Sequence, residues 1–174
     1  MKKIHLKKIL FFILLISLCT FETYTPIIVN SGLKKAMKKE PHTAISANLG
    51  AWIIVCGDRI DHHLLGAIRN GCDETYEALI NRGFDPDDIY YLDADYGTPS
   101  PYQEAISYRV NIQDAIETWA TTKVDTTHGL GIYLFDHGGT DYMCLPGTDL
   151  TETDLNTYLD NLETSTGCRR FIII

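Results

Sequence analysis

The sequence predicts an α/β fold, a three-layer α/β/α sandwich in which helices cover both faces of a mostly parallel sheet. Three observations lead to this prediction. Short apolar runs alternate with stretches of helical periodicity, and the first three runs end at aspartate or glycine. Apolar residues make up 45% of the 174 residues, which is enough for one domain with a hydrophobic core.

Four buried strands are expected, near residues 51–56, 88–93, 130–136 and 170–174. Each of these runs is short, and each lacks the polar alternation of a strand with one face in water. The segments between them are long enough for crossover helices. All four strands are therefore expected to lie parallel in one sheet.

The first two helices are predicted from their apolar spacing. Cys72, Tyr76, Leu79 and Ile80 share one helical face, and Gly83 is expected as the C-terminal cap. In the second helix Asn111 is the expected N-cap. It is followed by Ile112, Ala115, Ile116 and Trp119.

The third helix has the clearest start signal. Thr151 and Asp154 have the spacing of a capping box, with aspartate in place of the usual glutamate or glutamine. Leu150 and Leu155 are placed to form a hydrophobic staple across this start. The apolar face of the helix is supplied by Leu155, Tyr158, Leu159 and Leu162.

The N-terminal segment predicts export. Four lysines precede the apolar run Ile9–Leu18, which is too short for a comfortable membrane span, so residues 1–19 are interpreted as a signal peptide. Residues 20–48 are expected to form a linker, and residues 49–174 to form the folded domain. Cleavage, retention as an N-terminal anchor and lipidation at Cys19 stay open. The expected location is extracellular or at the cell surface, with membrane contact only through an uncleaved signal.

The charge of the exported part excludes one class of partner. Without the signal, 11 basic and 23 acidic residues remain, and phosphate backbones would repel such a surface. A nucleic-acid partner is therefore not expected.

Four cysteines follow the signal: Cys56, Cys72, Cys144 and Cys168. No two have the CxxC spacing of a zinc site, so no metal is expected there. An exported protein can form disulfides, and four cysteines allow three pairings among which the sequence does not choose. Cys56 lies inside an apolar strand and is expected to be a small buried hydrophobic residue.

The chemistry is expected where the strands end, because ligands of open α/β sheets bind outside the carboxyl ends of the strands. His137 is the strongest candidate there. It follows the third strand directly and precedes Gly138 and Gly139. The imidazole can transfer protons, and glycine lets a substrate carbonyl approach the backbone N–H groups.

Three segments resemble the caspase/haemoglobinase fold, and most closely the legumain family of cysteine peptidases. The first runs from AWIIVCGD through DETYEALINRGFDPDDIYYL, the second is GLGIYLFDHGG, and the third is LTETDLNTYLDNL with CRRFIII. The resemblance covers residues 51–174. It implies a caspase-like domain that is incomplete at its C-terminus.

The resemblance also implies a mechanism. A cysteine thiolate attacks the peptide carbonyl, His137 shuttles protons and the N–H of Gly138 helps to hold the oxyanion. The family's nucleophilic cysteine follows the last strand, so it is expected beyond residue 174. The implied function is a cysteine-type endopeptidase with peptide or protein substrates and no cofactor. The 174-residue chain alone is expected to be inactive.

Other interpretations stay open. Cys144 could replace the nucleophile, whereas Cys168 lies before the fourth strand, at the wrong end of the sheet. The chain could be an inactive caspase-like binding module. A metal-dependent phosphoesterase would use the aspartates at the strand ends, namely Asp58, Asp93, Asp95 and Asp136.

Substrate preference is also open. Relatives build the specificity pocket after the first strand, where Arg59, Asp61, His62, His63 and Arg69 are available for an acidic side chain. His62 and His63 as a metal-binding pair are a weaker interpretation than solvated loop histidines. The region 94–110 is expected to be a lid or an irregular surface loop.

Overall fold

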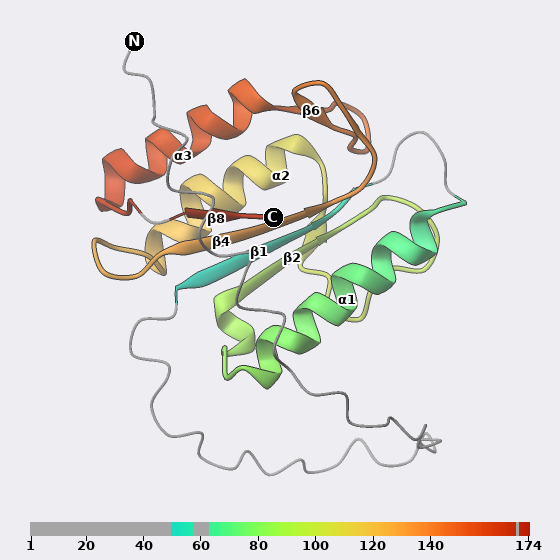
Figure 1. Cartoon of the computed structure of the whole chain (residues 1–174), viewed down its shortest axis with the longest axis horizontal. Helices are drawn as coiled ribbons and strands as arrows, with labels where there is room; N and C mark the ends of the chain where they lie inside the picture. The colour runs from blue at the N-terminus through green and yellow to red at the C-terminus, as the bar shows by residue number, and fades with distance from the viewer. Residues whose placement is uncertain (1–49, 58–62, 170) are drawn as a thin grey trace, which may run out of the picture. The chain divides into compact units, whose positions relative to one another are not determined.

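The computed structural model describes residues 50–57, 63–169 and 171–174 (Figure 1). The predicted signal peptide and the whole of the predicted linker lie outside these residues. None of the described helices is long and apolar enough to cross a membrane.

A five-stranded parallel sheet in the order β3-β2-β1-β4-β8 forms the centre of the domain (Figure 1). The strands are β1 (Ala51–Cys56), β2 (Ile89–Asp93), β3 (Ala105–Ile106), β4 (Leu130–Phe135) and β8 (Phe171–Ile173). Four of them match the predicted strands to within a residue or two. The predicted parallel α/β class is therefore confirmed.

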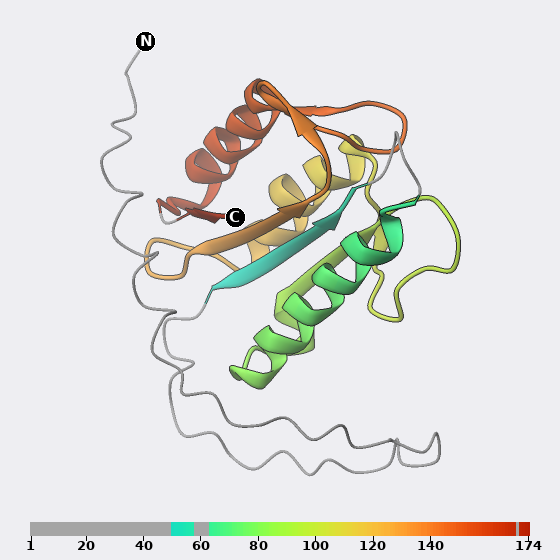
Figure 2. The ribbon, with the colours of Figure 1, turned by 45° about the vertical axis from the view of Figure 1, so that its right-hand side comes forward.

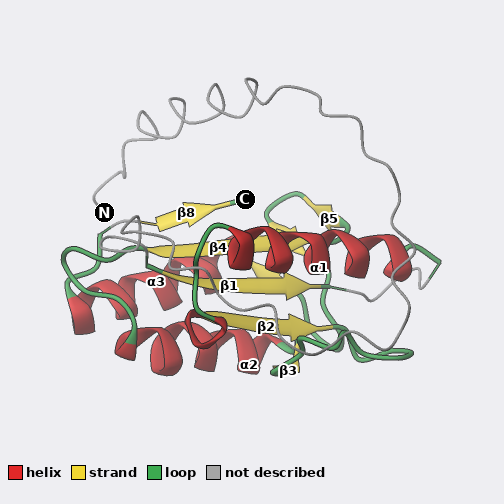
Figure 3. Cartoon of the chain, turned by 90° about the horizontal axis from the view of Figure 1, so that it is seen from below, coloured by secondary structure: helices red, strands yellow, loops and turns green. Residues whose placement is uncertain are grey.

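Helices cover both faces of this sheet, as Figures 2 and 3 show. Helix α1 (Leu65–Asn81) lies on one face, and α3 (Glu152–Thr166) lies on the other beside α2 (Arg109–Asp114). Helix α2 continues as a π-helical segment, η5 (Ala115–Trp119), and a 3-10 segment, η6 (Ala120–Thr122). A short 3-10 turn, η4 (Pro86–Asp88), precedes β2.

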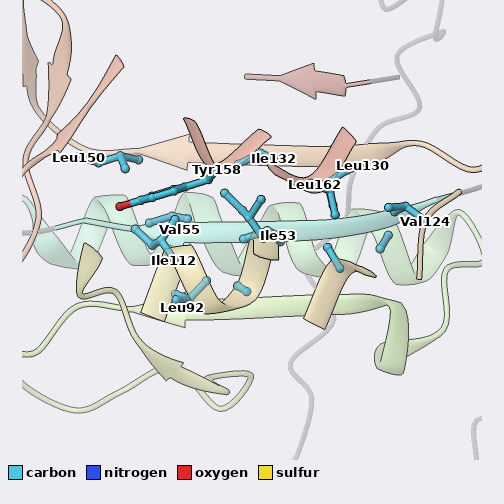
Figure 4. Packing of buried hydrophobic residues seen from close by; sticks show 14 of the residues in the cluster. Ile53, Val55, Leu92, Ile112, Val124, Leu130, Ile132, Leu150, Tyr158 and Leu162 are labelled. Atoms are coloured by element: carbon cyan, nitrogen blue, oxygen red, sulfur yellow. The ribbon is translucent and has the colours of Figure 1, made fainter. Parts of the chain in front are cut away.

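The alternation of β1 divides the core into two clusters, because successive strand residues point to opposite faces. Ile53 and Val55 pack under α2 and α3 (Figure 4), whereas Ile54 and Cys56 pack under α1. Both faces of β1 are therefore buried. This explains why its sequence is apolar without alternation.

The start of α3 confirms the predicted capping box. The Thr151 hydroxyl accepts from the Asp154 N–H, and Asp154 in turn accepts from the Thr151 N–H. The start of α2 corrects a prediction. Tyr108, not Asn111, is its N-cap, and the Asn111 side chain donates to the carbonyl of Ile106 from inside the first turn. Asn111 thus stabilises the join between β3 and the helix.

The end of α1 differs by one position from the prediction. Arg82 is the C-cap, and Gly83 follows it with a φ of 95°. Glycine adopts this left-handed conformation without strain, so it suits the position just after a helix.

A second, smaller sheet was not predicted. It is antiparallel, in the order β5-β6-β7, and joins β5 (Gly138–Gly139), β6 (Tyr142–Met143) and β7 (Leu150–Thr151). Its strands have two residues each, too short for a recognisable sequence pattern. It begins directly after His137, so it shapes the predicted site.

Candidate active site at the carboxyl edge of the sheet

His137 lies where the sequence predicted, just beyond the carboxyl end of β4. The parallel register pairs Cys56 with Phe135, so β1 and β4 end at the same edge. Gly57 continues this pairing, since its N–H donates to the carbonyl of Phe135 at 3.1 Å. The residues after both strands therefore meet at one edge, as the parallel arrangement requires.

The imidazole of His137 is held by its sequence neighbour. Nδ1 of His137 lies 2.9 Å from Oδ1 of Asp136, whose side chain is 0% exposed, whereas the imidazole is 37% exposed. A carboxylate only accepts hydrogen bonds, so with Asp136 ionised the Nδ1 atom carries the proton. In the neutral ring Nε2 then has a free lone pair. This nitrogen can accept a proton.

Asp136 is packed against Gly57, the residue that follows β1. A Cβ atom at Gly57 would lie 2.6 Å from Oδ2 of Asp136 and 2.5 Å from the carbonyl oxygen of Cys144. Only glycine leaves room for both. Gly57 therefore lets the buried carboxylate lie directly over the end of β1.

The small sheet orients the backbone on either side of His137. The Cys144 N–H donates to the carbonyl of His137 at 3.0 Å, and Gly138 is opposite Met143 in the ladder. Hydrogen-bonded and non-hydrogen-bonded pairs alternate in an antiparallel ladder, so Gly138 occupies a non-hydrogen-bonded pair. Its N–H points away from β6. This direction leaves the N–H available to an outside acceptor.

Tyr142 covers the next glycine. A Cβ atom at Gly139 would lie 2.3 and 2.5 Å from ring atoms of Tyr142 and 2.6 Å from its hydroxyl oxygen, so this side chain lies against the backbone. The Tyr142 side chain is still exposed in part. It forms an aromatic wall beside the glycines that follow His137.

Asp93, at the end of β2, has a structural role. Its fully buried carboxylate accepts from Nε of Arg69 at 2.7 and 2.9 Å, and from the N–H groups of Ala94 and Ser100. Arg69 also donates to the carbonyl of Tyr96. These hydrogen bonds hold the segment after β2 against α1.

The alternative interpretation as a phosphoesterase gains no support from the aspartates that the structure describes. Asp58 lies outside the described residues, Asp93 is occupied by the donors above, and Asp95 accepts from the Tyr108 hydroxyl. This bond raises the pKa of Tyr108 above its ordinary value. Within residues 50–57, 63–169 and 171–174, no three His, Cys, Asp or Glu side chains are grouped to hold a metal.

The residues considered for substrate specificity are only partly described. Arg59, Asp61 and His62 lie outside the described residues. The interpretation of His62 and His63 as a metal-binding pair involves His62, so it lies outside them as well. His63 is exposed. Arg69 is paired with Asp93, so much of its charge is compensated within the protein.

Cys144 and Cys168 are both buried. Cys144 follows β6, and Sγ of Cys168 donates to the carbonyl of His128 near the opposite edge of the sheet. Burial keeps a thiol from attacking a peptide carbonyl. Their burial makes both residues weaker candidates for the nucleophile than an exposed cysteine would be.

His128 is a natural comparison for His137. Its Nδ1 atom lies 3.0 Å from Asp125, and its side chain is 36% exposed. Hydrogen bonds from Thr127 and His128 hold the pKa of Asp125 well below its usual range. Asp125, however, is 55% exposed, and the pair precedes β4. The chain thus has a second His–Asp pair away from the carboxyl edge.

No protein-family model matches this chain, and no curated protein matches it. The resemblance to the legumain family remains a prediction from the residues. The functional proposal therefore rests on the fold and on the geometry around His137.

Sequence reasoning missed two participants, Gly57 and the orienting role of Asp136. From the sequence, Asp136 is one of several aspartates at predicted strand ends. The dipeptide Asp136–His137 is a visible signal, but it does not show that the carboxylate is buried and turned toward Nδ1. In the sequence, Gly57 indicates only a turn after the first strand. Its packing against Asp136 cannot be seen there, because the two residues are about eighty positions apart.

Proposed function

We propose that this chain is the N-terminal part of a cysteine-type endopeptidase in which His137 shuttles protons and Gly138 binds the oxyanion. The observation that carries the proposal is the pairing of the exposed imidazole with the buried carboxylate of Asp136. A general base needs a fixed tautomer, which this pairing supplies, and access to its substrate, which the 37% exposure of the imidazole supports.

Asp136 acts as the positioning residue. It keeps the Nδ1 proton in place, so that Nε2 takes a proton from the nucleophile and later gives it to the leaving amine. Its charge stabilises the imidazolium that forms between these steps. Because the carboxylate is buried, water weakens this interaction little.

Gly138 supports the electrostatic half of the mechanism. Its N–H points out of the small sheet, next to His137, and a backbone N–H aimed at a developing oxyanion lowers the barrier. The absence of a side chain lets the substrate carbonyl come close.

We propose a cysteine after residue 174 as the nucleophile. The register of β8 on β4 supports this position. Ile174 donates to the carbonyl of Ile132 and accepts from the N–H of Leu134, so the chain is running parallel to β4. Residues that continued this direction would pass beside Asp136 and His137.

The test uses the protein extended beyond residue 174 and a set of fluorogenic peptides. The extended protein should cleave peptides and lose activity on thiol alkylation, and His137→Ala should reduce kcat at least about 1000-fold. The matched control is His128→Ala, which removes an equally exposed imidazole that also faces an aspartate. It should leave activity within about twofold.

Two outcomes contradict the proposal. Equal cleavage by the His137→Ala protein would remove His137 from the mechanism. Thiol-dependent cleavage by the 174-residue chain alone would show that the nucleophile lies within it, and Cys144 would then be the residue to examine. Circular dichroism of each variant separates loss of chemistry from loss of fold.

We also propose that the protein is exported and acts on peptides or proteins outside the cytoplasm, on the basis of the lysines and the apolar run Ile9–Leu18. N-terminal sequencing of extracytoplasmic protein should begin near residue 20. A soluble cytoplasmic product that retains Met1 would refute this.

A further inference from the structure

Two cysteines that the proposed mechanism does not use lie beneath α1. Cys56 ends β1 and faces α1, and Cys72 lies on the side of α1 that faces the sheet. Both side chains are fully buried. Sγ of Cys72 lies 3.9 Å from the carbonyl oxygen of Val55, the residue before Cys56. Both thiols therefore belong to the same buried cluster beneath α1, at the end of β1.

The backbone brings them together by a close approach at Gly71. A Cβ atom there would lie 2.4 Å from the ring of Phe135, so a larger residue would push α1 away from β4. Cys72 is the next residue along the helix. The glycine thus lets this turn of α1 settle onto the sheet, directly over the end of β1.

We infer that Cys56 and Cys72 are a disulfide-forming pair, which on oxidation covalently links α1 to β1 at the edge that carries His137. The sequence left three pairings of the four cysteines open, and the position of Cys72 Sγ against the strand residue before Cys56 favours this one. The inference is independent of the proposed peptidase activity.

The oxidation balances with a small disulfide such as glutathione disulfide as the oxidant. The thiolate of one cysteine attacks the oxidant, forming a mixed disulfide and releasing one glutathione thiolate. The second cysteine then attacks the protein sulfur of the mixed disulfide. A second glutathione thiolate leaves, and the two protons lost by the cysteines end on the two glutathiones.

The folded protein should react slowly. The hydrogen bond with Cys72, together with burial, raises the pKa of Cys56 well above that of an ordinary thiol. Few thiolates form, and the oxidant cannot enter without local opening. Refolding in the presence of the oxidant avoids this barrier, because the thiols are accessible until α1 packs.

The linked loop is long enough to matter for stability. It contains 15 residues, and a cross-link of this size restricts the unfolded chain substantially. The disulfide should raise Tm by about 10 °C, and a reductant should reverse the change.

The experiment refolds the full chain from denaturant in a glutathione redox buffer. Remaining thiols are then alkylated, and the digest is analysed by mass spectrometry. A peptide pair linked through Cys56 and Cys72, together with the rise in Tm, is the expected result. Predominant linkage of other cysteines, glutathione adducts at Cys56 or Cys72, or full alkylation of both residues would overturn the inference.

Variants separate the pair from the other cysteines. Cys72→Ala and Cys56→Ala should each abolish the shift in Tm between oxidised and reduced protein. Cys168→Ala removes a thiol that is equally buried and should leave the shift intact. If either single variant fails to fold, the linked peptide from the unchanged protein still decides the question.

Discussion

Gly57 and Asp136 lie so close together that a Cβ atom on the glycine would be 2.6 Å from a carboxylate oxygen of the aspartate. The added Cβ atom would also be 2.5 Å from the backbone carbonyl oxygen of Cys144, which cannot move without disturbing the small sheet. The end of β1, the carboxylate that holds His137 and the segment after β6 therefore form one packed unit.

Gly57→Ala should destabilise the protein by about 1–3 kcal/mol, because either Asp136 or the backbone must shift. The matched control is Gly66→Ala in α1, where a Cβ atom meets nothing within 4 Å. That change should stabilise the helix by about 0.5–1 kcal/mol. Chemical denaturation of both variants measures the two effects. A neutral Gly57→Ala would mean that this packing is looser than the distances indicate.

Asp136→Asn should reduce kcat of the extended protein at least about 100-fold while changing KM little. Asparagine has nearly the same shape, but it removes the charge and can hold the wrong imidazole tautomer. Asp125→Asn, next to His128, provides the control and should leave kcat unchanged. Steady-state kinetics with a fluorogenic peptide decide the matter. Equal kcat for the Asp136→Asn and unaltered proteins would exclude a positioning role.

Arg69→Ala should cost about 3 kcal/mol of stability, because it leaves the buried carboxylate of Asp93 without its cation. Arg109→Ala is the control, since the Arg109–Asp154 pair is partly exposed and should contribute less than about 1 kcal/mol. Urea denaturation at neutral pH compares the two. Similar losses for both variants would contradict the assigned difference in burial.

Asp154 makes the stability of α3 depend on pH. The hydrogen bond from the Thr151 hydroxyl is the main cause that lowers the pKa of Asp154, and Arg109 adds to it. A lowered pKa means that the stabilisation is present above the ordinary aspartate range and is lost as pH falls through the folded-state pKa. Asp154→Asn should therefore cost about 0.3–1 kcal/mol at pH 7 and progressively less toward pH 2.

Asp160→Asn, on the exposed side of the same helix, controls for the loss of one negative charge. It should have little effect at either pH. Denaturation curves at pH 7 and below pH 3 give the comparison, and a cost of Asp154→Asn that persists unchanged in acid would rule out the charged capping box as its origin.

The sequence by itself determined the strands and their parallel arrangement, because a strand buried on both faces must be apolar throughout. It also determined the start of α3, since a capping box lies within four consecutive residues. His137 could be located for a similar reason: a polar residue directly after a buried strand lies at the carboxyl edge of the sheet. All of these signals are local in the chain.

Only the tertiary structure decided what surrounds His137. The fit of Gly57 against Asp136, the outward N–H of Gly138 and the shared burial of Cys56 and Cys72 all depend on segments that are distant in sequence or on strands of two residues. The correction at Asn111 has the same origin, because its side chain binds the carbonyl of Ile106 once β3 has joined the sheet. Distances between side chains depend on how the layers pack, and the apolar periodicity of the sequence does not predict them.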